Sequence, residues 1–279
     1  DNKEVPASLT IVGGGVIGME FASFFTSLGV QVTVVEMLDE ILGGMDKELS
    51  AMLRAEYAKK GIKFLLSTKV VGVSKGETGI TVSYENADGA GTVTADKLLM
   101  SVGRRPVTKG FGLENLNLEW TERRCIKVDE QLQSSVPGVY VCGDLNGVSL
   151  LAHTAVREAE VAVHHITGKE DAMSYRAIPG VVYTNPEIAG VGMSEEALQA
   201  AGIPYRAVKL PMAYSGRFVA ENEGVTAEDG TVLGAHMLGN PASELIVLAG
   251  MAIEDGKTIE DWKRYVFPHP TVGEIFREL

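Results

Sequence analysis

The sequence has little cysteine and fewer basic than acidic residues. Only Cys125 and Cys142 are cysteines among 279 residues, too few for the disulfide framework of a small secreted domain. Lysine and arginine number 25 against 37 aspartates and glutamates, a formal net charge of −12, which argues against a nucleic-acid-binding surface. We therefore expect a protein of a reducing compartment, the cytoplasm, with no nucleic-acid partner.

Long apolar runs and an initiator methionine are also missing. No apolar run reaches the roughly 18 residues that span a bilayer, so we expect no membrane segment. The chain begins at Asp1 and its first strand follows almost at once, so we expect a piece of a larger protein. With 45% hydrophobic residues and a mean hydropathy of +0.09, it can bury substantial cores in about two domains.

The opening stretch carries the most informative motif. In order it comprises a β-branched strand over 9–12, the glycines Gly13, Gly15 and Gly18 in G-x-G-x-x-G spacing, a helical segment over 19–29, a strand over 32–35, and Glu36. The first glycine allows a tight turn, the second lets a pyrophosphate approach, and the third lets helix and strand pack. The helix N-terminus favours the phosphates. The stretch predicts a dinucleotide-binding βαβ unit.

Glu36 selects among dinucleotides. It follows Gly18 by 18 residues, where a carboxylate can accept hydrogen bonds from an adenine ribose and would repel a 2′-phosphate. The next residues, Met37-Leu38-Asp39-Glu40, supply no arginine or lysine. These features favour NAD(H) over NADP(H), while FAD remains an alternative occupant.

The rest of the chain reads as further α/β structure. Helices are expected over 46–61, 153–167, 194–201 and 242–255, and strands over 62–66, 68–73, 79–84, 91–94, 97–102, 126–128, 139–142, 181–183, 188–192, 205–210 and 231–238. The strands from 62 to 94 predict a small antiparallel excursion with turns at 74–77 and 86–89, and 107–124 predicts a loop with short helical turns. From Pro179 the grouping of strands and helices indicates an α+β domain.

Asp144 and the pair His164 and His165 each have a ligand-binding interpretation and a purely structural one. Asp144, after a strand and Gly143, is either a ligand residue at the carboxyl edge of a sheet or a turn aspartate. His164 and His165 fit a solvated helix end better than a metal site, and no metal is expected.

His269 lies between Pro268 and Pro270, with Glu274 five residues later. The prolines fix its approach and Glu274 could orient its ring for proton transfer, but the residues alone favour a capped turn with a solvated histidine.

Seven segments together resemble the pyridine nucleotide-disulfide oxidoreductase family, in its order and over nearly the whole chain. They are 13–20 with Glu36, 101–106, 135–144, 151–153, 183–189, 234–239, and 269–271 with Glu274. The implied fold class is α/β, with a Rossmann-type NAD-binding domain (1–106), the C-terminal part of an FAD-binding domain (107–176) and an α+β dimerisation domain (177–279). The likeness is strongest to members that oxidise dihydrolipoyl groups.

The resemblance also implies roles for residues. The implied NAD site consists of Gly13, Gly14, Gly15, Val16, Ile17, Gly18, Met19, Glu20, Glu36, Val70 and Gly103, with Glu20 reaching toward the flavin. The implied FAD site includes Asp144 on the ribityl chain and Leu150, Leu151, Ala152 and His153 near the ring. His269 would accept a proton from a dihydrolipoyl thiol and Glu274 would hold its tautomer. The implied partners are a second copy of the chain and lipoyl domains of 2-oxo acid dehydrogenase complexes or the glycine cleavage system.

The sequence departs from the family at several points. The FAD glycine motif and a C-x-x-x-x-C redox pair are missing, so we expect no catalysis by this chain alone, and Cys142 fits a small buried apolar residue. Phe267 replaces a histidine, leaving His269 alone for proton transfer, and Gly273 replaces a serine, which could loosen the helix start. The stretch 223–227 looks too short for the strand that the family has there. A glutathione or mercuric reductase, or a non-enzymatic NAD-binding dimerisation module, remains an alternative.

Overall fold

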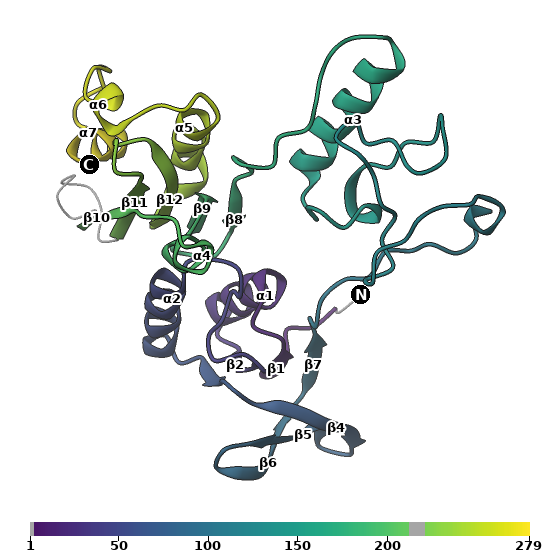
Figure 1. Cartoon of the computed structure of the whole chain (residues 1–279). Helices are drawn as coiled ribbons and strands as arrows, with labels where there is room; N and C mark the ends of the chain where they lie inside the picture. The colour runs from purple at the N-terminus through teal and green to yellow at the C-terminus, as the bar shows by residue number, and fades with distance from the viewer. Residues whose placement is uncertain (1–2, 212–220) are drawn as a thin grey trace. The chain divides into compact units, whose positions relative to one another are not determined.

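The computed structural model describes residues 3–211 and 221–279. It divides into two compact units, one formed by Asp1–Gly103 with Pro179–Leu279 and the other by Arg104–Ile178 (Figure 1). Among the described residues, every helix is too short or too polar to cross a bilayer.

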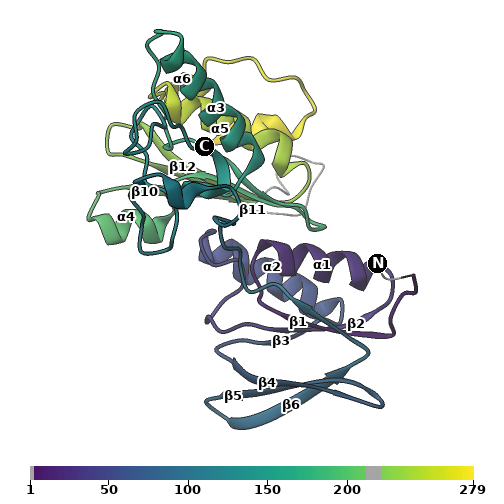
Figure 2. The ribbon, with the colours of Figure 1, turned by 90° about the vertical axis from the view of Figure 1, so that its right-hand side faces the viewer.

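A parallel sheet forms the base of the first unit, in the order β3-β2-β1-β7. Its strands are β1 (Ser8–Val12), β2 (Gln31–Val35), β3 (Lys63–Leu65) and β7 (Lys97–Met100). Helices α1 (Val16–Ser27) and α2 (Lys47–Lys59) cover one face, and an antiparallel sheet of β4 (Lys69–Gly76), β5 (Gly79–Asn86) and β6 (Gly89–Ala95) lies on the other (Figure 2). These layers confirm the predicted α/β fold.

Several elements of this region differ from the prediction, among them the strand over 97–102, which ends at Met100, and the turn over 86–89, whose end residues belong to β5 and β6. β3 does not belong to the antiparallel excursion, because it pairs parallel with β2. The first helix begins at Val16 rather than Met19, since the Met19 N–H donates to the Gly15 carbonyl at 2.9 Å and closes a turn there. The predicted turn at 74–77 is partly strand, because β4 pairs with β5 as far as Gly76.

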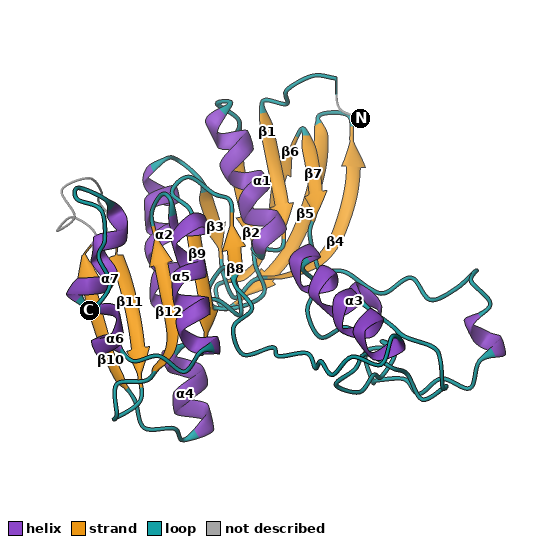
Figure 3. Cartoon of the chain, turned by 90° about the horizontal axis from the view of Figure 1, so that it is seen from above, coloured by secondary structure: helices purple, strands orange, loops and turns teal. Residues whose placement is uncertain are grey.

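The first unit also contains the α+β part of the chain. An antiparallel sheet runs β10-β11-β12-β9-β8, and α5 packs on β9 and β12 (Figure 3). The elements are β8 (Gly180–Val182), β9 (Ile188–Gly192), α4 (Glu195–Ala201), β10 (Arg206–Pro211), β11 (Glu221–Thr226), β12 (Val232–Leu238), α5 (Ala242–Glu254), α6 (Ile259–Trp262), the 3₁₀ turn η4 (Val272–Glu274) and α7 (Ile275–Glu278). The expected lack of a strand near 223–227 is wrong, because β11 pairs with both β10 and β12.

One apolar core joins the two parts of this unit. Met19 and Leu53 from α1 and α2 pack in the same buried cluster as Val182, Ile188 and Leu238 from the second sheet. The nucleotide-binding layers and the C-terminal sheet therefore share buried surface, which stabilises both by the hydrophobic effect.

The second unit is mostly loop around α3 (Ala152–Ile166), with 3₁₀ turns η1 (Leu113–Asn115) and η2 (Gly143–Leu145). The predicted strands 126–128 and 139–142 form only isolated bridges, such as Val128 with Ser134 and Gln133 with Tyr140. Leu132 has φ of 66° and interrupts the extended chain between them, and a two-stranded ribbon is marginal without neighbours.

Candidate functional site

The glycine turn between β1 and α1 is shaped by close packing at two positions and by open space at a third. Gly13 has φ of 102°, and a Cβ there would lie 2.4 Å from the Ser101 carbonyl oxygen. A Cβ on Gly18 would lie 2.0 Å from the Gly13 carbonyl oxygen, whereas one on Gly15 would meet no atom within 4 Å. Gly13 and Gly18 are thus required by the fold, and Gly15 leaves room for a ligand.

The N-terminus of α1 is open to an anion. Its N-cap is Gly15, which has no side chain to cap the helix, and no acidic residue lies in the first turn. The N–H groups of Val16, Ile17 and Gly18 have no acceptor inside the helix, and the positive end of the helix dipole lies beside them. Met19 is fully buried, so its side chain packs in the core. A diphosphate fits this end of the helix.

The Glu36 carboxylate lies beside the glycine turn and is oriented by the backbone. Its Oε2 accepts from the Gly14 N–H at 2.5 Å and its Oε1 accepts from the Leu38 N–H at 2.8 Å. A carboxylate offers about four lone-pair sites. Two acceptor sites therefore remain for the hydroxyls of a ribose.

Two cations that follow Glu36 in the chain are paired with carboxylates. Lys47 Nζ lies 2.6 Å from Asp39 Oδ2. Arg54 donates to both oxygens of the buried Glu40, at 2.7 and 2.9 Å. Because these cations already have partners, the region fits the ribose of NAD better than a 2′-phosphate.

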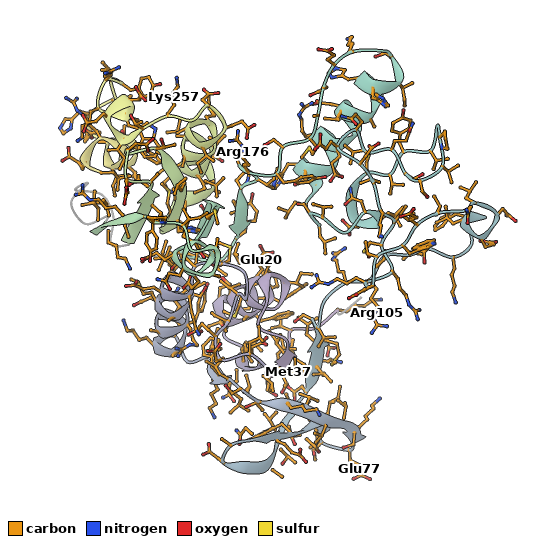
Figure 4. The ribbon with its side chains drawn as sticks, in the orientation of Figure 1. Glu20, Met37, Glu77, Arg105, Arg176 and Lys257 are labelled. Carbon is orange, nitrogen blue, oxygen red and sulfur yellow. The ribbon has the colours of Figure 1, made fainter. Side chains whose placement is uncertain are left out.

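The other residues expected at this site are more scattered. Glu20 Oε1 accepts from the Tyr183 N–H at 2.9 Å and so ties α1 to the end of β8 (Figure 4). Val70 is half-buried beside a bulge in β4. Gly103 has φ of 104° with open space at its Cβ position. The bond from Glu20 to Tyr183 had no signal in the sequence, because it joins residues 163 positions apart.

His269 and Glu274 are brought together. His269 Nδ1 lies 2.9 Å from Glu274 Oε1, and the histidine side chain is 82% exposed. Glu274 Oε2 accepts from the Thr271 N–H at 2.9 Å. This backbone hydrogen bond, and then the one to His269, lower the pKa of Glu274. Because an ionised carboxylate only accepts, Nδ1 carries the proton and Nε2 remains a base.

The second unit contains the residues expected to bind FAD. Asp144 lies in the η2 turn and not at a sheet edge, because the strand before it does not form. Asp144 and Leu150 line a cavity of about 760 Å³. Leu151 is the N-cap of α3, and Ala152 and His153 begin that helix. The other lining residues are Arg104, Arg105, Pro106, Val107, Thr108, Lys109, Glu122, Arg123, Arg124, Cys125 and Gly147. This excess of cations favours an anionic ligand in the cavity.

The two helix-end histidines have partners and are not simply solvated. His164 Nδ1 lies 2.7 Å from Asp171 Oδ2, and His165 Nδ1 lies 2.8 Å from the Tyr140 hydroxyl. Within 3–211 and 221–279, no cluster of histidine, cysteine and acidic residues could hold a metal ion. Cys142 is half-buried and unpaired to sulfur, and burial raises the pKa of its thiol.

Comparisons with known proteins agree on one family. The chain matches the pyridine nucleotide-disulphide oxidoreductase model over residues 1–159 and the dimerisation domain of the same family over 178–279. It is 40% identical to the dihydrolipoyl dehydrogenase of Geobacillus stearothermophilus and 41% identical to the human mitochondrial one, covering 99% of this chain and 60% and 56% of theirs. The chain thus spans somewhat more than half the length of these relatives.

Solved structures have the same fold. LpdA from Mycobacterium tuberculosis superimposes with a TM-score of 0.92 at 28% identity, and the HOCl-induced flavoprotein disulfide reductase RclA from Escherichia coli with 0.90 at 26%. Both matches cover 100% of this chain, and 62% and 65% of those chains. The chain belongs to the pyridine nucleotide-disulphide oxidoreductase family.

Proposed function

We propose that this chain is the NAD-binding and dimerising part of a flavoprotein that oxidises protein-bound dihydrolipoyl groups to lipoyl. The observation that carries the proposal is the exposed His269, whose Nδ1 lies 2.9 Å from Glu274 Oε1, in the segment that matches the dimerisation domain. The dihydrolipoyl dehydrogenases at about 40% identity support this substrate class.

The chemistry assigned to the chain's own residues is proton transfer and nucleotide binding. His269 Nε2 accepts the proton of a dihydrolipoyl thiol, because the thiolate and not the thiol attacks a disulfide. Glu274 holds the imidazole in the tautomer that can accept it and stabilises the imidazolium. FAD and NAD⁺, when bound, carry the two electrons away from the substrate. The α1 N-terminus and Glu36 bind and orient the NAD.

In this proposal, some of the groups that the reaction needs are supplied from outside these 279 residues. The attacked disulfide and the FAD diphosphate site come from a segment that the longer relatives have, so we expect no turnover by these 279 residues alone. Two copies pair through 177–279, and His269 serves the flavin of the other copy. Lipoyl domains of 2-oxo acid dehydrogenase complexes or of the glycine cleavage system are the partners. The free thiols of Cys125 and Cys142 suit the reducing cytoplasm.

Replacement of His269 by glutamine in the full-length flavoprotein tests the proposal. We expect dihydrolipoamide oxidation to fall at least 100-fold, the lower end of what general acid–base catalysis contributes, with flavin retained. The matched control His165→Gln, whose ring bonds Tyr140, should keep normal turnover. Normal turnover in His269→Gln would refute the proton-transfer role. Turnover with glutathione or Hg(II) in place of dihydrolipoamide would favour the related reductases, and none with any of these would favour the non-enzymatic module.

A further inference from the structure

Helix α3 carries a buried carboxylate that the proposed chemistry does not use. Glu158 is 0% exposed. Its Oε2 accepts from the Gly143 N–H at 2.5 Å and its Oε1 accepts from the Tyr175 hydroxyl at 2.8 Å. Burial, and then the hydrogen bond to Glu158, raise the pKa of Tyr175, so this hydroxyl stays protonated and keeps donating at neutral pH.

The Gly143 N–H that Glu158 accepts belongs to the turn that carries Asp144. The Asn146 N–H donates to the Gly143 carbonyl at 3.0 Å and closes η2. Gly143 has φ of 72°, and a Cβ there would lie 3.2 Å from the Ala155 Cβ on α3. The turn is therefore held against α3 by packing on one side and by the Glu158 carboxylate on the other.

The same face of α3 also holds the second segment expected at the flavin. Thr154 lies one turn before Glu158, so the two side chains point the same way. Its hydroxyl lies 2.8 Å from the Ser149 hydroxyl, and Thr154 is 1% exposed. Two buried polar side chains thus tie α3 to the loop before it and to the η2 turn.

We propose that Glu158 is a positioning residue for FAD, which sets the place of Asp144 through the Gly143 N–H. This inference rests on the proposed function, in which Asp144 binds the ribityl chain. Removing the acceptor would leave a buried N–H without a partner, so the turn would move to reach water. Asp144 would then lose its place relative to the ligand although its own side chain is intact.

Flavin binding by variants of the full-length apoprotein tests the inference, with the FAD dissociation constant, the flavin absorption band and the melting temperature as readouts. Glu158→Leu should weaken FAD binding at least tenfold, about what an unsatisfied buried group costs. Glu158→Gln, whose amide oxygen still accepts from Gly143, should stay within about threefold of wild type. Glu160→Leu, on the same helix with its side chain 57% exposed, is the matched control and should change none of the three.

The outcomes separate this inference from the proposed function. If Asp144→Ala weakens FAD binding and Glu158→Leu does not, Glu158 has no positioning role, and the flavin assignment stands. If Asp144→Ala binds FAD as wild type does, the flavin assignment fails first. If Glu158→Leu does not fold, Glu158→Asp decides, because its carboxylate keeps the charge but is one methylene shorter and draws the acceptor away from the Gly143 N–H: several-fold weaker FAD binding supports the inference and unchanged binding overturns it.

Discussion

Neighbouring glycines of the first turn are required for different reasons. A Cβ on Gly18 would lie 2.0 Å from a backbone oxygen, and one on Gly15 would meet nothing within 4 Å. We expect Gly18→Ala to lower the free energy of unfolding by about 1–3 kcal/mol, the usual cost of overpacking. Gly15→Ala should unfold as wild type does but bind NADH at least several-fold more weakly, because its methyl occupies the ligand's approach. Urea unfolding and NADH titration of both variants check these two predictions. They would be contradicted if the two variants changed the free energy of unfolding equally and the NADH dissociation constant equally.

The Glu274 carboxylate predicts a pH dependence. Its pKa is lowered from 4.5 by the Thr271 N–H and by His269. A group whose folded pKa is lowered stabilises the fold fully above its unfolded pKa and loses that effect as pH falls through the folded pKa. Glu274→Gln should therefore melt at a lower temperature than wild type above pH 4.5. The two should converge as the pH falls below that value, and a difference that persists at the acid end would argue against this pairing.

At the scale of elements, a tyrosine of α2 bonds both α1 and the loop between β8 and β9. The Tyr57 hydroxyl donates to the Ser23 hydroxyl at 2.6 Å and accepts from the Asn185 N–H at 3.0 Å. Tyr57 is 1% exposed, and Tyr57→Phe removes the hydrogen bonds of its hydroxyl, so we expect a loss of about 1 kcal/mol in the free energy of unfolding. Tyr265→Phe, at a position that is 49% exposed, is the control in the same denaturation experiment and should change little.

Elements with strong local signals were predictable. The Asp46 side chain caps α2, as Ser194 caps α4, and both helices lie where the periodicity placed them. β11 was missed because its sequence, Glu221–Thr226, has little apolar alternation and the strand is specified by its neighbours β10 and β12. The pair near 126–142 failed for the opposite reason, since β-branched residues alone do not form a ladder across the positive φ of Leu132.

At the scale of the whole molecule, the proposed nucleotide site predicts that NADH affects one of the two units and not the other. All residues of the glycine turn, α1 and Glu36 lie in the unit formed by 1–103 and 179–279. We expect NADH to slow amide hydrogen exchange at 13–18 and in the segment after β2. Exchange in 104–178 should not change when this chain alone binds NADH. Protection that is strongest in 104–178 would move the NAD site to the other unit.

The site was predictable from the sequence where it depends on local spacing. The glycine turn and the pairing of His269 with Glu274, five residues apart, follow from near neighbours in the chain. The bond from Glu20 to Tyr183 and the support of η2 by Glu158 depend on long-range packing. The sequence held no sign of either, because a single carboxylate on a helix fits a solvated face equally well.

An NADH titration of the 279-residue chain tests the central claim most directly. Glu36→Arg should weaken NADH binding at least tenfold, because it removes the ribose acceptors. The same substitution should bring the dissociation constants of NADH and NADPH closer together. Glu77→Arg makes the same charge change at the tip of the β4–β5 turn, away from Met37 at the end of β2 (Figure 4), and should bind NADH as wild type does. Equal NADH affinity in wild type and Glu36→Arg would contradict the assignment of this carboxylate and of the site built around it.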